Sequence, residues 1–307
     1  MSSKKIVFIV GPTAIGKSNI AMEIVQITPS QIISCDSTQV YKEITIASNK
    51  PSSDILARVP HHLINIISLK DQFDVSQFYR MSNQAIESII KEGQLPLVVG
   101  GSGLYMKILL DGIFKGGEPD IKLREELKQE AEEFGNEYLY DRLISVDPMA
   151  AKKIHPNDVK KVIRALEVSM LLGRPISEKQ QECEGIWGKY DITIIGLNCP
   201  RDLLYDHINK RVDMMFDAGL IEEIKKLDAM PLSPSAAGMI GIKEVQGYLK
   251  GEHDLDTAKN LMKQNTRRYA KRQLTWFRKE GRIQWLEFSS PRETGKIVNL
   301  IKETTGL

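Results

Sequence analysis

Cysteine is scarce in this sequence, with 3 residues in a chain of 307. Cys35, Cys183 and Cys199 are scattered and no C-x-x-C pair is present, so neither a disulfide framework nor a zinc site is predicted. We expect reduced, structural thiols in a cytosolic protein. The five histidines have no metal-ligand spacing either, and the adjacent His61 and His62 would diverge in an extended segment.

Long hydrophobic runs are also missing. No stretch approaches the roughly 18 apolar residues that span a membrane. The short apolar run at 6–10 follows Lys4 and Lys5, but Gly11 and Pro12 end it without the small-residue cleavage site of a signal peptide. We therefore expect a soluble, cytoplasmic protein that does not contact a membrane, and no feature indicates an obligate protein partner.

Charge of one sign is not in excess. The chain has 42 Lys+Arg against 40 Asp+Glu, a net charge of +2, so affinity for nucleic acid would have to come from local clustering. With 42% hydrophobic and 27% charged residues it is close to the average soluble protein, which excludes wholesale disorder. Its length is that of one large domain or two.

Short apolar runs dominate what is present. Runs of this kind, separated by helical stretches, are typical of strands buried on both faces of a parallel sheet. We predict a doubly wound α/β sheet, with strands at 6–10, 32–34, 95–99 and 192–197, a weaker candidate at 283–286, and helices at 19–27 and 78–91.

The middle of the chain contains no convincing strand. Residues 115–189 are therefore predicted to be a helical insertion domain, with helices at 121–134 and 159–172 and glycine hinges at 116–117 and 185–188. Residues 1–114 and 190–307 would form the α/β core. Its last part is predicted to be helical at 201–226, irregular at 231–241 and helical again at 256–280.

The strongest motif is a phosphate-binding loop of the form G-x-x-x-x-G-K-[ST] between a predicted strand and a predicted helix. Its residues are Gly11, Pro12, Thr13, Ala14, Ile15, Gly16, Lys17 and Ser18. In such a loop backbone N–H groups and a helix N-terminus face phosphate oxygens. Lys17 would add a positive charge, and the Ser18 hydroxyl could ligate Mg²⁺.

Two further strand ends carry polar or flexible residues. Asp36 follows the strand at 32–34 and is interpreted as a metal ligand, a general base or a turn cap. Residues 100–103, Gly-Gly-Ser-Gly, follow the strand at 95–99, where P-loop NTPases usually have a metal-binding acid. This glycine turn is either a second backbone anion site or an ordinary turn.

A basic segment lies near the end of the chain. Residues 259–282 include nine Lys or Arg and one acid. On a helix, Arg267, Lys271 and Arg278 would form one stripe, and Tyr269 and Trp276 another. The segment is either a solvated basic face or a surface that contacts nucleic-acid phosphates.

Together these motifs resemble the tRNA dimethylallyltransferase (tRNA isopentenyltransferase) family. The resemblance is carried by residues 36–41 (DSTQVY), 100–105 (GGSGLY) and 270–277 (AKRQLTWF), with support from 61–63 and 164–168, and extends from about residue 6 to 278. It implies transfer of a dimethylallyl group from dimethylallyl diphosphate to N6 of the adenosine 3′ to the anticodon of tRNA. It also implies Mg²⁺ as cofactor and a P-loop core with a helical insertion.

The resemblance also assigns roles to residues. It places the diphosphate on residues 11–18 and Arg211, makes Asp36 the general base and puts Ser102 at the reacting centre. Around the flipped base it places Ser37, Thr38 and Gln39. The remaining contacts with tRNA would come from Arg124, Lys160, Lys161 and Arg164 in the insertion and from Arg267, Lys271 and Arg272 in the basic segment.

The sequence departs from the family pattern in places, because Ser102 replaces the common Thr, Lys160-Lys161 replaces Gln-Arg, and Ile242 replaces Tyr. Two other function classes account for parts of the sequence. A small-molecule P-loop kinase with a helical lid would explain the phosphate loop and the insertion, but not residues 36–41. A non-enzymatic RNA-binding protein would explain the basic segment and leave Lys17 without a role.

Overall fold

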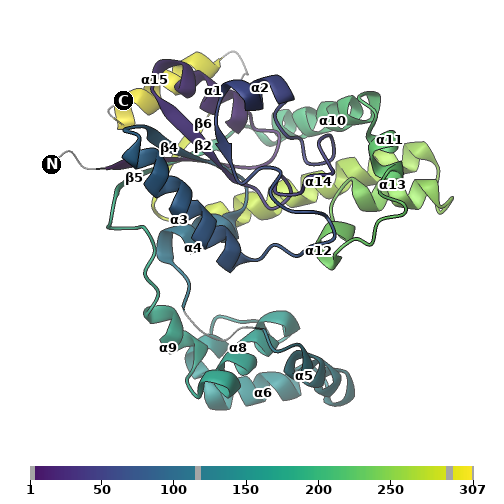
Figure 1. Ribbon diagram of the computed structural model, residues 1–307. Helices are drawn as coiled ribbons and strands as arrows, with labels where there is room; N and C mark the ends of the chain where they lie inside the picture. The colour runs from purple at the N-terminus through teal and green to yellow at the C-terminus, as the bar shows by residue number, and fades with distance from the viewer. Residues whose placement is uncertain (1–3, 115–118, 288–292, 306–307) are drawn as a thin grey trace. The chain divides into compact units, whose positions relative to one another are not determined.

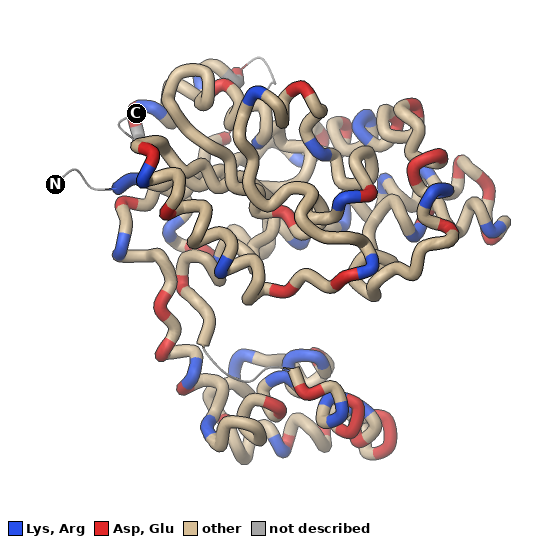
Figure 2. The backbone as a smooth tube through the Cα atoms, viewed as in Figure 1, with Lys and Arg blue, Asp and Glu red and all other residues tan. Residues whose placement is uncertain are grey.

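The chain is organised as an α/β unit interrupted by a helical unit. The computed structural model describes residues 4–114, 119–287 and 293–305. The first unit comprises Met1–Leu109 and Trp187–Leu307, and the second comprises Leu110–Ile186. The glycines at 116–117, predicted to be a hinge, lie outside the described residues. Lys and Arg are interspersed with Asp and Glu along both units, as Figure 2 shows.

The first unit contains a six-stranded sheet with the order β3-β2-β4-β1-β5-β6, in which every pairing is parallel. The predicted parallel α/β sheet is thus confirmed, and only the two-residue β3 was not predicted. The strands are β1 (Lys5–Val10), β2 (Ser30–Cys35), β3 (His61–His62), β4 (Leu95–Gly100), β5 (Asp191–Asn198) and β6 (Ile283–Glu287).

Helices cover both faces of this sheet (Figure 1). On one face α1 (Lys17–Ile27) and α15 (Thr294–Thr305) pack against the strands, and on the other lies α3 (Val75–Lys91). The remaining helices of the unit are α2 (Ser53–Arg58), α4 (Gly103–Asp111), α10 (Arg201–Asp217), α11 (Leu220–Lys225), α12 (Pro234–Ala237), α13 (Ile242–Leu249) and α14 (Leu255–Phe277). The predicted helix at 201–226 is divided, because Gly219 adopts φ 96° between α10 and α11.

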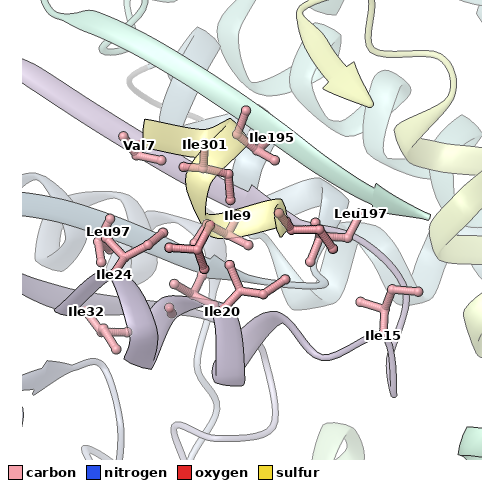
Figure 3. Close-up of a cluster of buried hydrophobic side chains, with 14 of the residues drawn as sticks. Val7, Ile9, Ile15, Ile20, Ile24, Ile32, Leu97, Ile195, Leu197 and Ile301 are labelled. Carbon is pink, nitrogen blue, oxygen red and sulfur yellow. The ribbon is translucent and has the colours of Figure 1, made fainter. Parts of the chain in front are cut away.

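The apolar core explains why the central strands have no polar face. Val7 and Ile9 of β1 point toward α1 and meet Ile20 and Ile24, as Figure 3 shows. Successive side chains of a strand point to opposite faces, so the intervening Phe8, fully buried, lies on the face that α3 covers. Burial on both faces produces the continuous apolar runs seen in the sequence.

The second unit is entirely helical in its described residues. It consists of α5 (Ile121–Phe134), α6 (Asn136–Val146), α7 (Pro148–Ala151), α8 (Val159–Leu172) and α9 (Ile176–Gln181). Its core cluster, which includes Leu127, Leu139 and Leu166, draws on residues of this unit alone. No helix among the described residues of either unit is both long and apolar enough to traverse a bilayer.

The sheet topology brings three loops to one edge. Val10 of β1 and Cys35 of β2 are both in register with Gly100 of β4, which lies between them. The segments that follow these strands therefore leave the sheet side by side at its carboxyl edge. In open α/β sheets this edge is where ligands bind.

Candidate active site

The phosphate loop joins β1 to α1. Gly11 adopts φ 149°, and a Cβ placed on it would lie 2.8 Å from the backbone oxygen of Leu197. Gly16 adopts φ 96° directly before α1 begins at Lys17. Both glycines are therefore required by the backbone: the first by its approach to β5 and the second by its left-handed conformation. The N-terminus of α1, which attracts anions, opens onto this loop.

Lys17 lies folded within the loop. Its Nζ donates to the backbone oxygens of Gly11 at 3.0 Å and Pro12 at 2.8 Å. Burial and the neighbouring positive charge of Arg211 lower the pKa of Lys17 to about 7, although Asp36 opposes the shift. An anion that entered the loop would favour the charged ammonium, so phosphate binding and protonation of Lys17 reinforce each other.

Arg211 adds a second positive charge from α10. Its guanidinium donates to the hydroxyl of Thr13, so α10 holds the phosphate loop at its third residue. Burial lowers the pKa of Arg211 to about 10, and the nearby Asp36 carboxylate opposes this. At neutral pH the guanidinium remains charged.

Asp36 follows β2 and faces both cations. Its Oδ1 accepts hydrogen bonds from the Thr38 backbone N–H at 2.8 Å and the Thr38 hydroxyl at 2.7 Å. One carboxylate oxygen thus caps a local turn, while Oδ2 has no hydrogen-bond partner among the described residues. The turn-cap interpretation therefore does not exclude a chemical role, because the two oxygens can serve different purposes.

A hydrogen-bond network fixes the loop beyond Asp36. Gln39 accepts at Oε1 from the Ser34 hydroxyl at 2.8 Å and donates to the Asn49 backbone oxygen at 3.3 Å. Glu223 of α11 accepts from three consecutive backbone N–H groups, those of residues 45–47, at 2.6, 2.9 and 2.8 Å. Glu223 could not be recognised from the sequence, because its partners are 176 or more residues away.

The glycine turn after β4 packs against α14. A Cβ on Gly101 would lie 2.2 Å from Nε2 of Gln273, and one on Gly103 would lie 2.1 Å from Trp276. Gln273 is buried and uses both ends of its amide, accepting from the Thr13 N–H at 2.8 Å and donating to the Gly101 oxygen at 2.9 Å. Gln273 belongs to the 270–277 motif, but nothing in the sequence indicated this function.

Ser102 lies at the start of α4. Its N–H donates to the backbone oxygen of Cys35 at 3.1 Å, and its hydroxyl accepts from the Tyr105 N–H at 3.4 Å. The hydroxyl therefore acts as a helix cap in this structure. Burial raises the pKa of both the Cys35 thiol and the Tyr105 phenol, and the charge of Asp36 adds to each shift, so both stay neutral.

These loops enclose a cavity of about 670 Å³. Six of the eight residues of the phosphate loop line it, namely Thr13, Ala14, Ile15, Gly16, Lys17 and Ser18, whereas Gly11 and Pro12 do not. Gln39, which was predicted to lie near the flipped base, lines it as well. Asp36 and Arg211 also line it, whereas Ser37, Thr38 and Ser102 do not. The rest of the wall includes residues 48–52 and His61, His207 and Lys210, none of which the sequence predicted to line the site.

The donor set of this cavity suits Mg²⁺ only in company with a substrate. No group of three or more His, Cys, Asp or Glu arranged to hold a metal occurs in the described part of the chain. The Ser18 hydroxyl and the Asp36 carboxylate do line the same cavity. Mg²⁺ is commonly held by one or two protein oxygens together with substrate phosphates and water, so these two residues fit it.

The basic segment forms α14, but its exposed face differs from the predicted stripe. Arg267 donates to Oδ1 of Asn209 at 2.7 Å and lies over the Tyr205 ring, so its guanidinium is engaged with α10. The exposed cations on this helix are Arg268, Lys271 and Arg272, with Arg278 just beyond its end. We refer to Arg268, Lys271 and Arg272 as the basic face of α14.

In the second unit, two of the arginines that were predicted to bind tRNA form ion pairs with a buried glutamate. Arg124 contacts Glu167 through two hydrogen bonds of 2.8 and 2.9 Å, and Arg164 contacts it at 2.6 Å. Glu167 is fully buried, and these bonds lower its pKa against the effect of burial. Lys161 is paired with Asp158, whereas Lys160 is exposed.

Comparison with known proteins gives one consistent result. The family model described as IPP transferase matches residues 39–280. A tRNA dimethylallyltransferase of Geobacter sulfurreducens is 43% identical, covering 94% of this chain and 93% of its own length. One of Acetivibrio thermocellus is 41% identical over 98% of both chains.

Solved structures agree with these sequence matches. The full-length tRNA isopentenylpyrophosphate transferase of Bacillus halodurans is 37% identical with a TM-score of 0.71, covering 99% of this chain and 97% of its own. A eukaryotic dimethylallyltransferase described as acting on tRNA is 30% identical with a TM-score of 0.84, covering 98% of this chain and 79% of its own.

Proposed function

The chain belongs to the tRNA dimethylallyltransferase family, and from this we propose that it transfers a dimethylallyl group from dimethylallyl diphosphate to N6 of the adenosine 3′ to the anticodon. One observation carries the proposal: the phosphate loop, the cations of Lys17 and Arg211, and the carboxylate of Asp36 line a single cavity. That combination serves a diphosphate leaving group and a proton acceptor at once.

The leaving group accounts for the phosphate loop. When the bond between the allylic carbon and the diphosphate oxygen breaks, negative charge grows on that oxygen. Lys17, Arg211 and the backbone N–H groups at the start of α1 would stabilise it in a partly desolvated site. Bound Mg²⁺, held by the Ser18 hydroxyl together with the diphosphate, would supply further positive charge.

The nucleophile accounts for Asp36. The exocyclic amine of adenine is a weak nucleophile, because its lone pair is delocalised into the ring. As N6 forms its bond to the allylic carbon, a carboxylate oxygen of Asp36 would accept the amine proton, a contribution of typically about 10²–10⁴-fold. The adenine must leave its stack to enter the cavity, at a cost of a few kcal/mol that is lowest in a single-stranded loop.

Binding of tRNA would draw on both units. The basic face of α14 offers three exposed cations for phosphate contacts, and Arg267 stands beside it. Arg124, Lys160, Lys161 and Arg164 would contribute from the insertion, although Arg124 and Arg164 also hold Glu167. Action on tRNA anticodon loops would place the enzyme in the cytoplasm.

The kinase alternative is not favoured by the relatives, which are named as tRNA dimethylallyltransferases. It also needs an ATP γ-phosphoryl, whereas an allylic carbon arrives already activated. We therefore expect the reaction to run without ATP.

The test is the stoichiometry of the reaction. Purified protein with dimethylallyl diphosphate, Mg²⁺ and an adenosine-containing anticodon stem-loop should add one C5 unit per RNA by mass spectrometry and release one diphosphate. No nucleotide is supplied. A strict requirement for ATP, or RNA that gains no C5 unit, would overturn the proposal.

A further inference from the structure

Gln273 joins three parts of the first unit through one side chain. It belongs to α14, accepts from the Thr13 N–H of the phosphate loop and donates to the Gly101 oxygen of the glycine turn. All of these contacts are short, at 2.8 and 2.9 Å, and the side chain is buried. A buried amide left without partners is costly, so these bonds hold both loops to the helix.

The glycine turn packs tightly against this amide. A Cβ on Gly101 would lie 2.2 Å from Nε2 of Gln273, so the turn approaches the amide as closely as its backbone permits. From α10, Arg211 donates to the Thr13 hydroxyl. Thr13 is thus held from α10 by its side chain and from α14 by its backbone.

The residues before Gln273 in the sequence face outward. Lys271 and Arg272 are exposed and belong to the basic face of α14, whereas Gln273 points inward to the two loops. Because they are adjacent on one helix, any adjustment of α14 upon contact with RNA phosphates would be transmitted to the Gln273 amide and its contacts with Thr13 and Gly101. A ligand can shift an equilibrium only through such differential contacts.

We propose that Gln273 is a positioning residue that couples RNA binding on α14 to diphosphate binding in the phosphate loop, an inference that rests on the proposed function of both surfaces. Coupling of this kind is reciprocal, so the binding of each ligand raises the affinity for the other by the same factor. Gln273 does not line the cavity, and its side chain is buried.

The coupling factor is the ratio of dissociation constants for inorganic diphosphate without and with an anticodon stem-loop. For the unaltered protein we expect a ratio of roughly five or more. Gln273→Met keeps the side-chain length but removes both hydrogen bonds, and should bring the ratio to within about twofold of one. Gln264→Met makes the same chemical change at an exposed position of the same helix and should leave the ratio unaltered.

A second variant approaches the contact from the other side. Gly101→Ala would push against Nε2 of Gln273 and should also lower the ratio, whereas adding Gly101→Ala to Gln273→Ala should change nothing further, because the clashing amide is gone. This pair decides the matter if Gln273→Met does not fold. A substitution that only damages the structure would weaken the binding of each ligand but leave the ratio of dissociation constants unchanged.

The inference is overturned if the unaltered protein shows a ratio of one, or if the ratio persists in both Gln273→Met and Gly101→Ala. Transfer of the C5 unit is measured on the same preparations. Normal transfer with a ratio of one rejects the coupling alone, whereas absence of transfer by the unaltered protein rejects the proposed function.

Discussion

At the scale of single residues, Asp36 combines two tasks in one carboxylate. Oδ1 caps the turn at Thr38, and Oδ2 remains for the cavity. Asp36→Asn retains an oxygen that can accept from Thr38 and so preserves the turn, but it removes the basic carboxylate. We expect the rate of C5 transfer in single-turnover experiments to fall by at least about 100-fold, with RNA affinity within a few-fold.

Asp36→Ala is the companion variant, since it removes the cap as well as the base. It should lower the thermal midpoint in addition to the rate, whereas Asp36→Asn should leave the midpoint close to that of the unaltered protein. Near-normal turnover in Asp36→Asn would eliminate the role as general base.

Lys17 gives a prediction about pH. Its pKa of about 7 lies below the ordinary value for lysine, so in the empty site its amine is mostly neutral at pH 8 and charged at pH 6. Diphosphate favours the charged form and raises this pKa. Binding of diphosphate at pH 8 should therefore take up a proton at Lys17, and affinity should decline as the pH rises above about 7.

Calorimetry in buffers of different ionisation enthalpy measures this uptake. Lys17→Arg is the control, because its guanidinium stays charged throughout. The difference in proton uptake between the two proteins should approach one at pH 8 and vanish at pH 6, by the linkage between protonation and binding. Equal uptake at pH 8 would contradict the prediction, and protonation of the diphosphate itself cancels in the comparison.

At the scale of elements, α14 presents cations on one side and the Gln273 contacts on the other. Replacing Arg268, Lys271 and Arg272 with Gln should weaken RNA binding and reduce its salt dependence. Each lost phosphate contact lowers the slope of log K against log salt by about 0.7–0.9, so a reduction of roughly 2–3 is expected. Binding of inorganic diphosphate alone should change little.

The control removes the same charge elsewhere, through Lys225→Gln, Lys226→Gln and Lys250→Gln, which are all exposed. If the control flattens the salt dependence equally, net charge and not α14 is responsible. If the slope of log K against log salt is unchanged in the α14 variant, the basic face of α14 is an ordinary solvated surface that does not contact RNA phosphates.

Glu223 offers a second test at this scale, because α11 holds the loop at 45–47 through a single carboxylate. Glu223→Ala leaves three backbone N–H groups without this acceptor and should destabilise the protein by about 1–3 kcal/mol, measured by urea unfolding. The exposed neighbour Glu222 is the control, and Glu222→Ala should cost less than about 0.5 kcal/mol. Equal effects of the two substitutions would show that the contacts of Glu223 do not stabilise the loop.

At the scale of the whole molecule, each unit has a core of its own. The hydrophobic clusters around β1 and around α13 contain residues of the first unit only, and the cluster around Leu127 contains residues of the second only. The two ends of the insertion are adjacent, since a Cβ on Gly185 would lie 2.0 Å from the Leu110 oxygen. A short linker can therefore replace the insertion.

We expect the protein with residues 112–184 replaced by a short Gly-Ser linker to unfold cooperatively and to bind inorganic diphosphate within a few-fold of the full chain. Its affinity for an anticodon stem-loop should fall at least about tenfold, because the cations of the insertion are removed. Undiminished RNA affinity would show that the insertion does not contribute to binding.

The sequence by itself determined the elements and their class. Strands buried on both faces must be apolar throughout, so the runs at 6–10 and 95–99 could be recognised directly, as could the phosphate loop from its glycines and Lys17. The sequence did not predict the short β3, the division between α10 and α11, the helices α2, α4, α12, α13 and α15 of the first unit, or α6, α7 and α9 of the insertion. Most of these elements are short, and a short element contains few repeats of its period.

Tertiary structure alone decided which side chains meet. Gln273 contacts Thr13 across 260 positions, and Glu223 reaches residues 45–47 across at least 176. Arg267 was predicted to face solvent with Lys271, but α10 packs beside it and engages its guanidinium through Asn209. The pattern of apolar and polar residues within one segment indicates which residues are buried and whether the segment is helical. Contacts between distant segments depend on how the sheet orders its strands and on which helices then lie side by side, and no single segment encodes that.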